Sequence, residues 1–139
     1  MTTAVPAVRN AVRTWLEKYE AGDTVFVAVS GGADSLALAY ALSVEAEILA
    51  ITVIGVTVDH QLQAASSAQA EKVVAQLSKF GLSCVIKKVT VDIKEGLEAS
   101  ARKVRYEALS EVAEQENAVA VFLGHTKDDQ AETVLLGLA

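Results

Sequence analysis

A stretch near the amino end of the chain reads Val25-Phe26-Val27-Ala28-Val29-Ser30-Gly31-Gly32-Ala33-Asp34-Ser35. Its first part is apolar and rich in valine, which predicts a buried strand, and the alanine- and leucine-rich residues after Ser35 predict a helix. A glycine-rich turn between a strand and a helix directs backbone N–H groups and the positive end of the helix dipole at one point, an arrangement that suits phosphate. The two glycines allow close approach to an anion, and Ser30 and Ser35 add hydroxyl donors.

Asp34 is the unusual residue of this turn, because a carboxylate repels phosphate unless a cation lies between them. We therefore interpret the turn as a site for a polyphosphate that carries a metal ion, most simply Mg-ATP. The turn has neither the lysine of a Gly-x-x-x-x-Gly-Lys-Ser/Thr loop nor the Gly-x-Gly-x-x-Gly dinucleotide fingerprint. The alternative is a tight strand-to-helix turn in which Asp34 only complements the helix dipole.

The rest of the chain alternates helical and strand patterns. This alternation predicts an α/β fold, with a parallel, doubly wound, Rossmann-like sheet covered by helices on both faces. The strand order 3-2-1-4 would place the loops after the first and fourth strands on either side of the switch point, where ligands bind. We expect strands at 24–29, 51–58, 83–91 and 118–123, and helices at 8–19, from 35 into the mid-forties, from Ser66 or Ser67 as cap to Gly81, at 97–115, and after His125 with Thr126 as cap.

Polar clusters follow three of the predicted strands. Besides the first turn, Asp59-His60 follows the second strand and residues 124–133, Gly-His-Thr-Lys-Asp-Asp-Gln-Ala-Glu-Thr, follow the fourth. The carboxyl ends of parallel strands share one edge, so these clusters are expected to form one site. Asp59 could hold a metal or a ribose hydroxyl and His60 a base or phosphate; the alternative is a polar strand exit.

We interpret the third cluster as the start of the last helix. Helical spacing would place Glu132 on the same side as Asp128 and Asp129, where three carboxylates need a cation. The alternative is that these acids only complement the helix dipole. On the predicted helix 97–115, Glu98, Arg102, Arg105 and Tyr106 form a polar stripe, which is also typical of a solvated helix face.

Composition limits the function classes. The formal net charge is −6 and the pI near 4.9, with no basic run, so the ligand is small or tight nucleic-acid binding belongs to sequence outside this chain. A single cysteine, Cys84, excludes an internal disulfide and a cysteine-rich zinc site. No apolar run reaches about 18 residues and no secretory signal is seen, so no membrane contact and a cytoplasmic location are expected. The apolar residues 134–139 continue a helical pattern, which predicts a C-terminal truncation.

The turn at 30–35 resembles the pyrophosphate loop of the N-type ATP pyrophosphatases. Over residues 8–139 the chain resembles the tRNA(Ile)-lysidine synthetases in the order and spacing of its motifs. These motifs are Ser30-Gly31-Gly32-Ala33-Asp34-Ser35, Val58-Asp59-His60, Glu98 to Arg102 with Arg105-Tyr106, and Gly124-His125 with Asp128 to Thr133. Two departures are the Gln61-Leu62-Gln63 that replaces the usual Gly-Leu-Arg, and the lack of the family's Arg-Gly-Ser-Gly-like segment and tRNA-binding regions.

The resemblance implies an adenine nucleotide alpha hydrolase-like fold, with residues 1–139 as the ATP-pyrophosphatase nucleotide-binding domain. It implies that ATP adenylates the 2-oxo group of the wobble cytidine of isoleucine tRNA and that free lysine then displaces AMP. The implied cofactor-binding residues are Ser30, Gly31, Gly32, Ala33, Asp34, Ser35, Asp59, His60, Gly124 and His125. The implied catalytic residues are Asp34, Arg102, Arg105, His125, Asp129 and Glu132, and the implied Mg²⁺ ligands are Asp34, Asp128 and Asp129. A homodimer is left open.

Two other functions are compatible with these motifs. One is another N-type pyrophosphatase, such as a tRNA thiolase or an amidotransferase-type synthetase. Thiolation needs reactive cysteines, and Cys84 lies alone in a predicted strand, which argues against it. The other is a non-catalytic ATP-binding module, which would not need so many carboxylates around the nucleotide.

Overall fold

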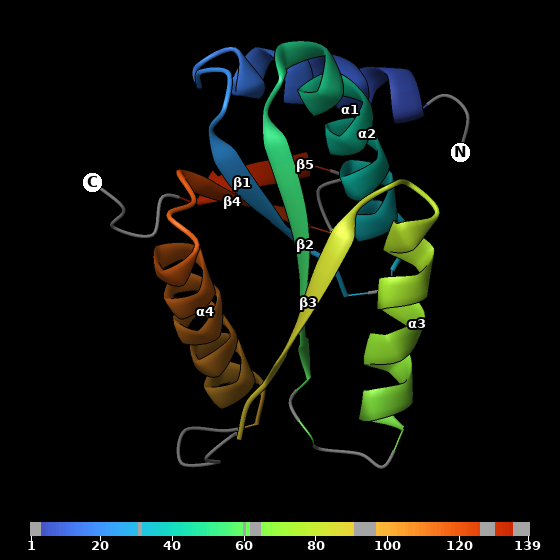
Figure 1. Ribbon diagram of the computed structural model, residues 1–139. Helices are drawn as coiled ribbons and strands as arrows, with labels where there is room; N and C mark the ends of the chain where they lie inside the picture. The colour runs from blue at the N-terminus through green and yellow to red at the C-terminus, as the bar shows by residue number, and fades with distance from the viewer. Residues whose placement is uncertain are drawn as a thin grey trace.

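The computed structural model describes residues 4–30, 32–59, 61, 65–90, 97–125 and 130–134. Helices and strands alternate along most of this part of the chain (Figure 1). In chain order the elements are α1 (Ala4–Leu16), β1 (Thr24–Ala28), α2 (Ala33–Leu49), β2 (Thr52–Asp59), α3 (Ser66–Ser78), β3 (Ser83–Lys88), α4 (Leu97–Gln115), β4 (Ala120–His125) and β5 (Gln130–Val134).

The strands form one sheet in the order β3-β2-β1-β4-β5. β1 pairs in parallel with β2 and β4, and β2 pairs in parallel with β3. The predicted α/β fold and the predicted order 3-2-1-4 of the parallel strands are therefore confirmed. Val25, Phe26 and Val27 of the central strand β1 are all buried, which explains why this strand is apolar without alternation.

Two apolar cores lie on opposite faces of the sheet. Val27 of β1 and Phe122 of β4 pack toward α1, α2 and α3, together with Leu42 of α2. Phe26 of β1 packs on the other face, where Leu109 belongs to α4. Figure 1 shows α4 on one side of the strands and α2 and α3 on the other. The predicted helices on both faces are thus present: α1, α2 and α3 cover one face of β1, and α4 covers the other.

The predicted helix bounds agree with the structure most closely for α4. Leu97–Gln115 coincides with the predicted helix, and Ala108 and Val112 on it are buried as expected. The capping prediction for α3 is wrong, because Ala65 occupies the position before the helix and already has the right-handed helical conformation. None of the described helices combines the length and the apolar character needed to cross a membrane.

The last described segment differs from the prediction. Residues 130–134 form a strand, β5, which pairs antiparallel with β4, so that Glu132 lies opposite Leu123. The predicted helix over these residues is wrong, and so is the helical spacing that placed Glu132 beside Asp128 and Asp129. Thr133 and Val134 are β-branched and favour extended backbone, and β4 offers a sheet edge whose backbone groups need partners. The proposed cap, Thr126, lies outside the described residues.

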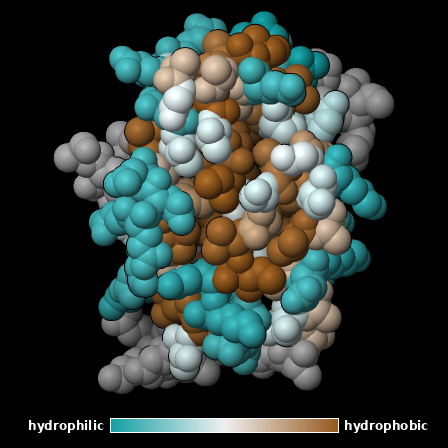
Figure 2. All heavy atoms as spheres, viewed as in Figure 1, coloured by the Kyte–Doolittle hydropathy of each residue, from teal (hydrophilic) through white to brown (hydrophobic). Residues whose placement is uncertain are grey.

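The other edge of the sheet is β3. Val85 on this strand is exposed, and Ile54, Val58 and Ile86 nearby are half-buried. Figure 2 shows hydrophobic atoms gathered over the middle of the same view, between hydrophilic atoms on either side. The hydrophobic atoms lie along the side of the molecule where β2 and β3 run between α3 and α4 in Figure 1.

Candidate functional site

The four parallel strands end at one edge of the sheet, here called the carboxyl edge. Ala28 at the end of β1 pairs with Val56 of β2 and with Leu123 of β4. β2 continues from there to Asp59, and β4 continues to His125. The structure therefore brings the start of the Ser30–Ser35 loop, the end of β2 and the end of β4 to the same edge, as the sequence predicted.

Ser35 braces the Ser30–Ser35 loop. The N–H of Ser30 donates to Ser35 Oγ at 3.3 Å, and Ser35 Oγ donates to the carbonyl oxygen of Gly32 at 3.0 Å. Ser35 is buried, with 5 % of its surface exposed, whereas Ser30 is exposed. The hydroxyl of Ser35 thus joins the two ends of the loop, and the hydroxyl of Ser30, 3.4 Å from it, lies on the solvent side.

The loop leads into the amino end of α2. Gly32 is the residue before this helix, its backbone is extended with φ −74° and ψ 159°, and no side chain caps the helix through it. The positive end of the dipole of α2 therefore faces the loop. A Cβ atom built on Gly32 would contact only Ser30 Oγ, at 3.7 Å, so the packing of the described residues does not by itself demand glycine. Room for a ligand would explain the glycine.

Asp59 is a buried carboxylate at the carboxyl edge, with 3 % of its surface exposed. Its Oδ1 accepts the N–H of Gln61 at 2.9 Å, and its backbone carbonyl accepts the N–H of Val89 at 2.9 Å. The last residue of β2 is thus held to the segment that follows β3. A buried acid is costly without such partners. Asp59 is a functional candidate because it lies at the same edge of the sheet as the Ser30–Ser35 loop.

Cys84 lies away from this edge. It is near the amino end of β3, opposite Gly55 of β2, and burial raises the pKa of its thiol to about 11. A thiol with that pKa is protonated at neutral pH and is a poor nucleophile. The structure therefore supports the prediction that Cys84 is part of the packing of the sheet.

Several predicted site residues have only their backbone position described. Ala33 and Asp34 lie in the first turn of α2, Arg102 and Arg105 lie on α4, and Gly124 and His125 end β4. Gly31, His60, Asp128 and Asp129 lie outside the described residues. Among the residues whose side chains are described, no group of three His, Cys, Asp or Glu could hold a metal ion. The predicted roles of all these residues remain predictions.

Sequence reasoning missed the part that Gln61 plays at this edge. Its backbone φ is +57°, and its side-chain Nε2 donates to the carbonyl oxygen of Val89 at 3.1 Å. The only sequence signal was its place in Gln61-Leu62-Gln63, where the family that the chain resembles usually has glycine first. Glycine is the residue that adopts positive φ without strain.

The fold and the loop define the class of this chain: a doubly wound α/β domain with a glycine-rich strand-to-helix loop at its carboxyl edge. A protein-family model described as the PP-loop domain matches residues 6–139. The chain therefore belongs to the PP-loop family, and the predicted resemblance is confirmed at this level. ATP is the nucleotide that this family uses.

Curated relatives show which members of the family the chain is similar to. The chain is 52% identical over 136 residues to the tRNA(Ile)-lysidine synthase of Thermobifida fusca, covering 97% of this chain and 42% of the relative. It is 57% identical over 116 residues to that of Streptomyces coelicolor, covering 83% of this chain and 33% of the relative. A third, from Salinispora arenicola, is 49% identical over 138 residues, 97% of this chain and 41% of the relative. The chain thus spans less than half the length of these relatives.

Solved structures support the fold. The U34-tRNA thiolase NcsA from Methanococcus maripaludis superimposes with a TM-score of 0.77 at 20% identity, covering 91% of this chain and 46% of that chain. The NH3-dependent NAD synthetase from Campylobacter jejuni superimposes with a TM-score of 0.59 at 15% identity, covering 86% of this chain and 54% of that chain. At such identities the likeness concerns the fold alone.

Proposed function

We propose that this chain is the ATP-pyrophosphatase nucleotide-binding domain of a tRNA(Ile)-lysidine synthase. The observation that supports the proposal is the meeting of the Ser30–Ser35 loop, Asp59 and the end of β4 at one edge, in a chain 52% identical to such a synthase. In the proposed reaction, ATP adenylates the 2-oxo group of the wobble cytidine of isoleucine tRNA and releases pyrophosphate. The amine of free lysine then displaces AMP and forms lysidine.

The Ser30–Ser35 loop would receive the pyrophosphate part of ATP. The N–H groups of Gly31 and Gly32 and the hydroxyl of Ser30 would donate to its oxygens, and the amino end of α2 would stabilise the charge that builds there. Ser35 would hold the loop in shape through its bonds to Ser30 and Gly32. Ala33 would contribute its backbone N–H in the first turn of α2.

Mg²⁺ fits the chemistry of this edge, because carboxylate oxygens are the ligands that it prefers. Asp34, in the first turn of α2, would hold it, with Asp128 and Asp129 as further ligands. When bound, the ion neutralises charge on the phosphates. Asp59 and His60 would position the ribose and base of the nucleotide, and Gly124 and His125 would contact it from the end of β4.

The remaining proposed roles concern the two other substrates. Asp129 and Glu132 would attract the ammonium group of lysine, whose charge is opposite to theirs. Arg102 and Arg105 would meet the cytidine or its phosphate from the first half of α4, a helix that starts near the carboxyl edge because it follows β3. We propose no role for Cys84 in the reaction, since its raised pKa makes a thiolation step through it unfavourable.

The bond that is cut in ATP tests the proposal. The chain, joined to the part of the Thermobifida fusca relative that it does not cover, is incubated with α-labelled ATP, lysine and isoleucine tRNA. We expect three products: labelled AMP, pyrophosphate, and tRNA that contains lysidine. None of them should form with the Asp34→Asn variant. Glu114→Gln, which changes an exposed acid on α4, is the matched control and should keep activity. Release of ADP and inorganic phosphate would contradict the proposal.

A further inference from the structure

Gln61 has an unusual backbone conformation for its place in the fold. Three described residues other than glycine have a positive φ: Ala50, Gln61 and Asn117. Ala50 and Asn117 follow the ends of α2 and α4, where a left-handed residue commonly ends a helix. Gln61 follows a strand instead, at the carboxyl edge. Strain at such a position persists only where surrounding interactions hold it, and it concentrates at functional sites.

Two hydrogen bonds hold Gln61 in this conformation. Its backbone N–H donates to Asp59 Oδ1 at 2.9 Å, and its side-chain Nε2 donates to the carbonyl oxygen of Val89 at 3.1 Å. The N–H of Val89 in turn donates to the carbonyl oxygen of Asp59 at 2.9 Å. These three bonds close a ring that joins the end of β2 to the segment after β3, and the carboxylate of Asp59 belongs to this ring.

We propose that Gln61 is a positioning residue that holds the carboxylate of Asp59 in its orientation for the nucleotide. The N–H of Gln61 donates to the carboxylate of Asp59, and the bond from the side-chain amide of Gln61 to Val89 offsets the strain of the left-handed conformation. A glycine here would adopt the same φ without strain but would have no side chain to reach Val89. Gln61 therefore couples the geometry of Asp59 to the position of Val89, directly after β3, and a glycine could not do this.

This inference rests on the proposed function in one respect, the assignment of Asp59 to the nucleotide site. The variant that tests it is Gln61→Met, which keeps the length of the side chain and its lack of charge and removes the donor to Val89. Gln115→Met is the matched control, because Gln115 is exposed at the end of α4, away from the carboxyl edge. A merely structural role would change the melting temperature without a specific effect on ATP.

The measurements are the affinity for Mg-ATP by titration calorimetry and the amide hydrogen exchange of Gln61 and Val89. We expect Gln61→Met to weaken ATP binding about three- to tenfold and to speed exchange at Gln61 and Val89, but not at Val27 in the middle of β1. Gln115→Met should leave both measurements unchanged. Because Gln61 acts through Asp59, Gln61→Met should cause no further loss of ATP affinity when it is added to Asp59→Asn.

Two outcomes would overturn the positioning role while leaving the proposed function intact. One is wild-type affinity for ATP in Gln61→Met; the other is an equal loss from Gln61→Met with and without Asp59→Asn. A wild-type chain that binds no ATP would contradict the proposed function itself and the positioning role with it. Unchanged exchange at Gln61 and Val89 would overturn the ring of hydrogen bonds without reference to any ligand.

Discussion

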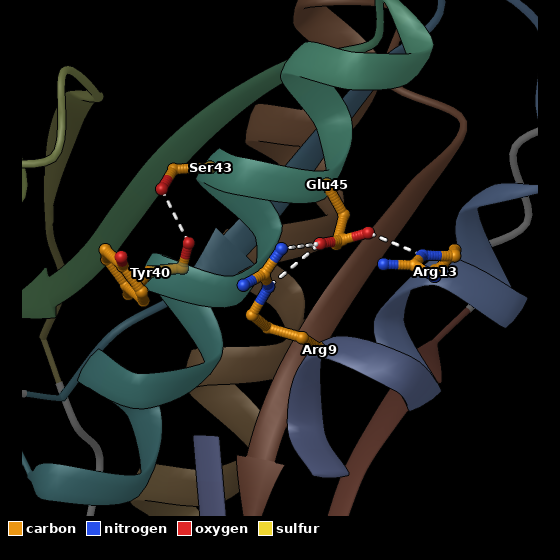
Figure 3. Close-up of polar contacts among 5 residues, drawn as sticks. All are labelled: Arg9, Arg13, Tyr40, Ser43 and Glu45. Carbon is orange, nitrogen blue, oxygen red and sulfur yellow. Dashed lines mark hydrogen bonds and ion pairs between the residues drawn. The ribbon is translucent and has the colours of Figure 1, made fainter. Parts of the chain in front are cut away.

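The carboxylate of Glu45 on α2 accepts a hydrogen bond from Arg13 Nε on α1, with 2.7 Å between Nε and Oε1. The other carboxylate oxygen accepts from Arg9, whose Nε lies 2.9 Å away and whose terminal nitrogen lies 2.8 Å away (Figure 3). The side chain of Glu45 is 2 % exposed, whereas those of Arg9 and Arg13 are 36% and 52% exposed. The buried acid is thus satisfied by two arginines that keep contact with water, and it fastens α1 to the helix that follows the Ser30–Ser35 loop.

We expect Glu45→Gln to destabilise the protein. The amide keeps the shape of the side chain, but it weakens two charge-assisted hydrogen bonds and directs an NH₂ group toward an arginine. The free energy of unfolding should fall by about 1–3 kcal/mol, the range for bonds to charged groups, as measured by urea denaturation at pH 7. Glu47→Gln changes an exposed acid on the same helix and should stay within about 0.5 kcal/mol of wild type. Equal effects of the two variants would contradict this assignment.

The same contact predicts a pH dependence. Hydrogen bonds from Arg13 and then Arg9 lower the pKa of Glu45 below its ordinary value of 4.5, against the opposing effect of burial. A carboxyl whose pKa is lower in the folded state stabilises the fold fully above its unfolded pKa, and this stabilisation is lost as the pH falls through the folded pKa. Below about pH 4.5 the wild type should therefore lose stability more steeply than Glu45→Gln. Parallel pH profiles of the two proteins in urea denaturation would show that Glu45 is not responsible.

Gly55 of β2 marks a close approach between the sheet and α3. A Cβ atom at this position would overlap Leu77 Cδ1 and would come within 3.4 Å of the backbone oxygen of Ser83. We expect Gly55→Ala to lower the free energy of unfolding by about 1–3 kcal/mol, the usual cost of overpacking. In a background that already carries Leu77→Ala, the same substitution should cost clearly less, because the overlapping atom is gone. Additive effects in this double-mutant cycle would exclude the overlap as the cause.

The charge of the chain predicts weak binding to tRNA. The net charge is −6 and the pI near 4.9, so repulsion opposes approach to the phosphate backbone. The chain alone should bind isoleucine tRNA no more tightly than about 1 µM at physiological salt, within the range of non-specific binding. Filter binding at several salt concentrations measures this affinity. A tighter complex that weakens little with added salt would show that a specific RNA surface is present in this chain.

Sequence patterns predicted the structural features that depend on residues close together in the chain. The bounds of α4 follow from apolar periodicity, and the parallel sheet follows from the alternation of helices with strands. The order 3-2-1-4 was expected because it places the loops after the first and fourth strands on either side of the switch point. β5 was missed because its conformation comes from pairing with β4, and an apolar run beside acids is compatible with a helix as well. The choice between the two depends on a partner strand, which periodicity does not contain.

The same distinction between local patterns and contacts distant in sequence applies to the candidate site and to Glu45. The positions of the Ser30–Ser35 loop, Asp59 and His125 at one edge could be predicted, because every parallel strand ends there. The contacts of Glu45 could not, since Arg9 and Arg13 lie 36 and 32 residues away in the sequence. The role of Gln61 depends on a backbone angle and on the carbonyl of Val89, 28 residues further along the chain.

Asp34 and Ser35 should differ in their effects on ATP. Asp34 follows Gly32 closely in the first turn of α2, and its carboxylate would tolerate phosphates only with a cation between them. Ser35 already donates to Gly32 and accepts from Ser30, so its hydroxyl shapes the loop. We expect Asp34→Ala to weaken Mg-ATP binding at least about tenfold, equivalent to ~1.4 kcal/mol, and Ser35→Ala to weaken it less while lowering the melting temperature more. Titration calorimetry with and without Mg²⁺ measures the first effect and thermal unfolding the second.

Loss of the acid also removes a favourable interaction of about 0.3–1 kcal/mol with the helix dipole, so a small stability loss in Asp34→Ala is compatible with the metal role. Equal ATP affinity of the wild type with and without Mg²⁺ would contradict the metal role of Asp34, because a carboxylate in a phosphate loop repels the phosphates unless a cation lies between them.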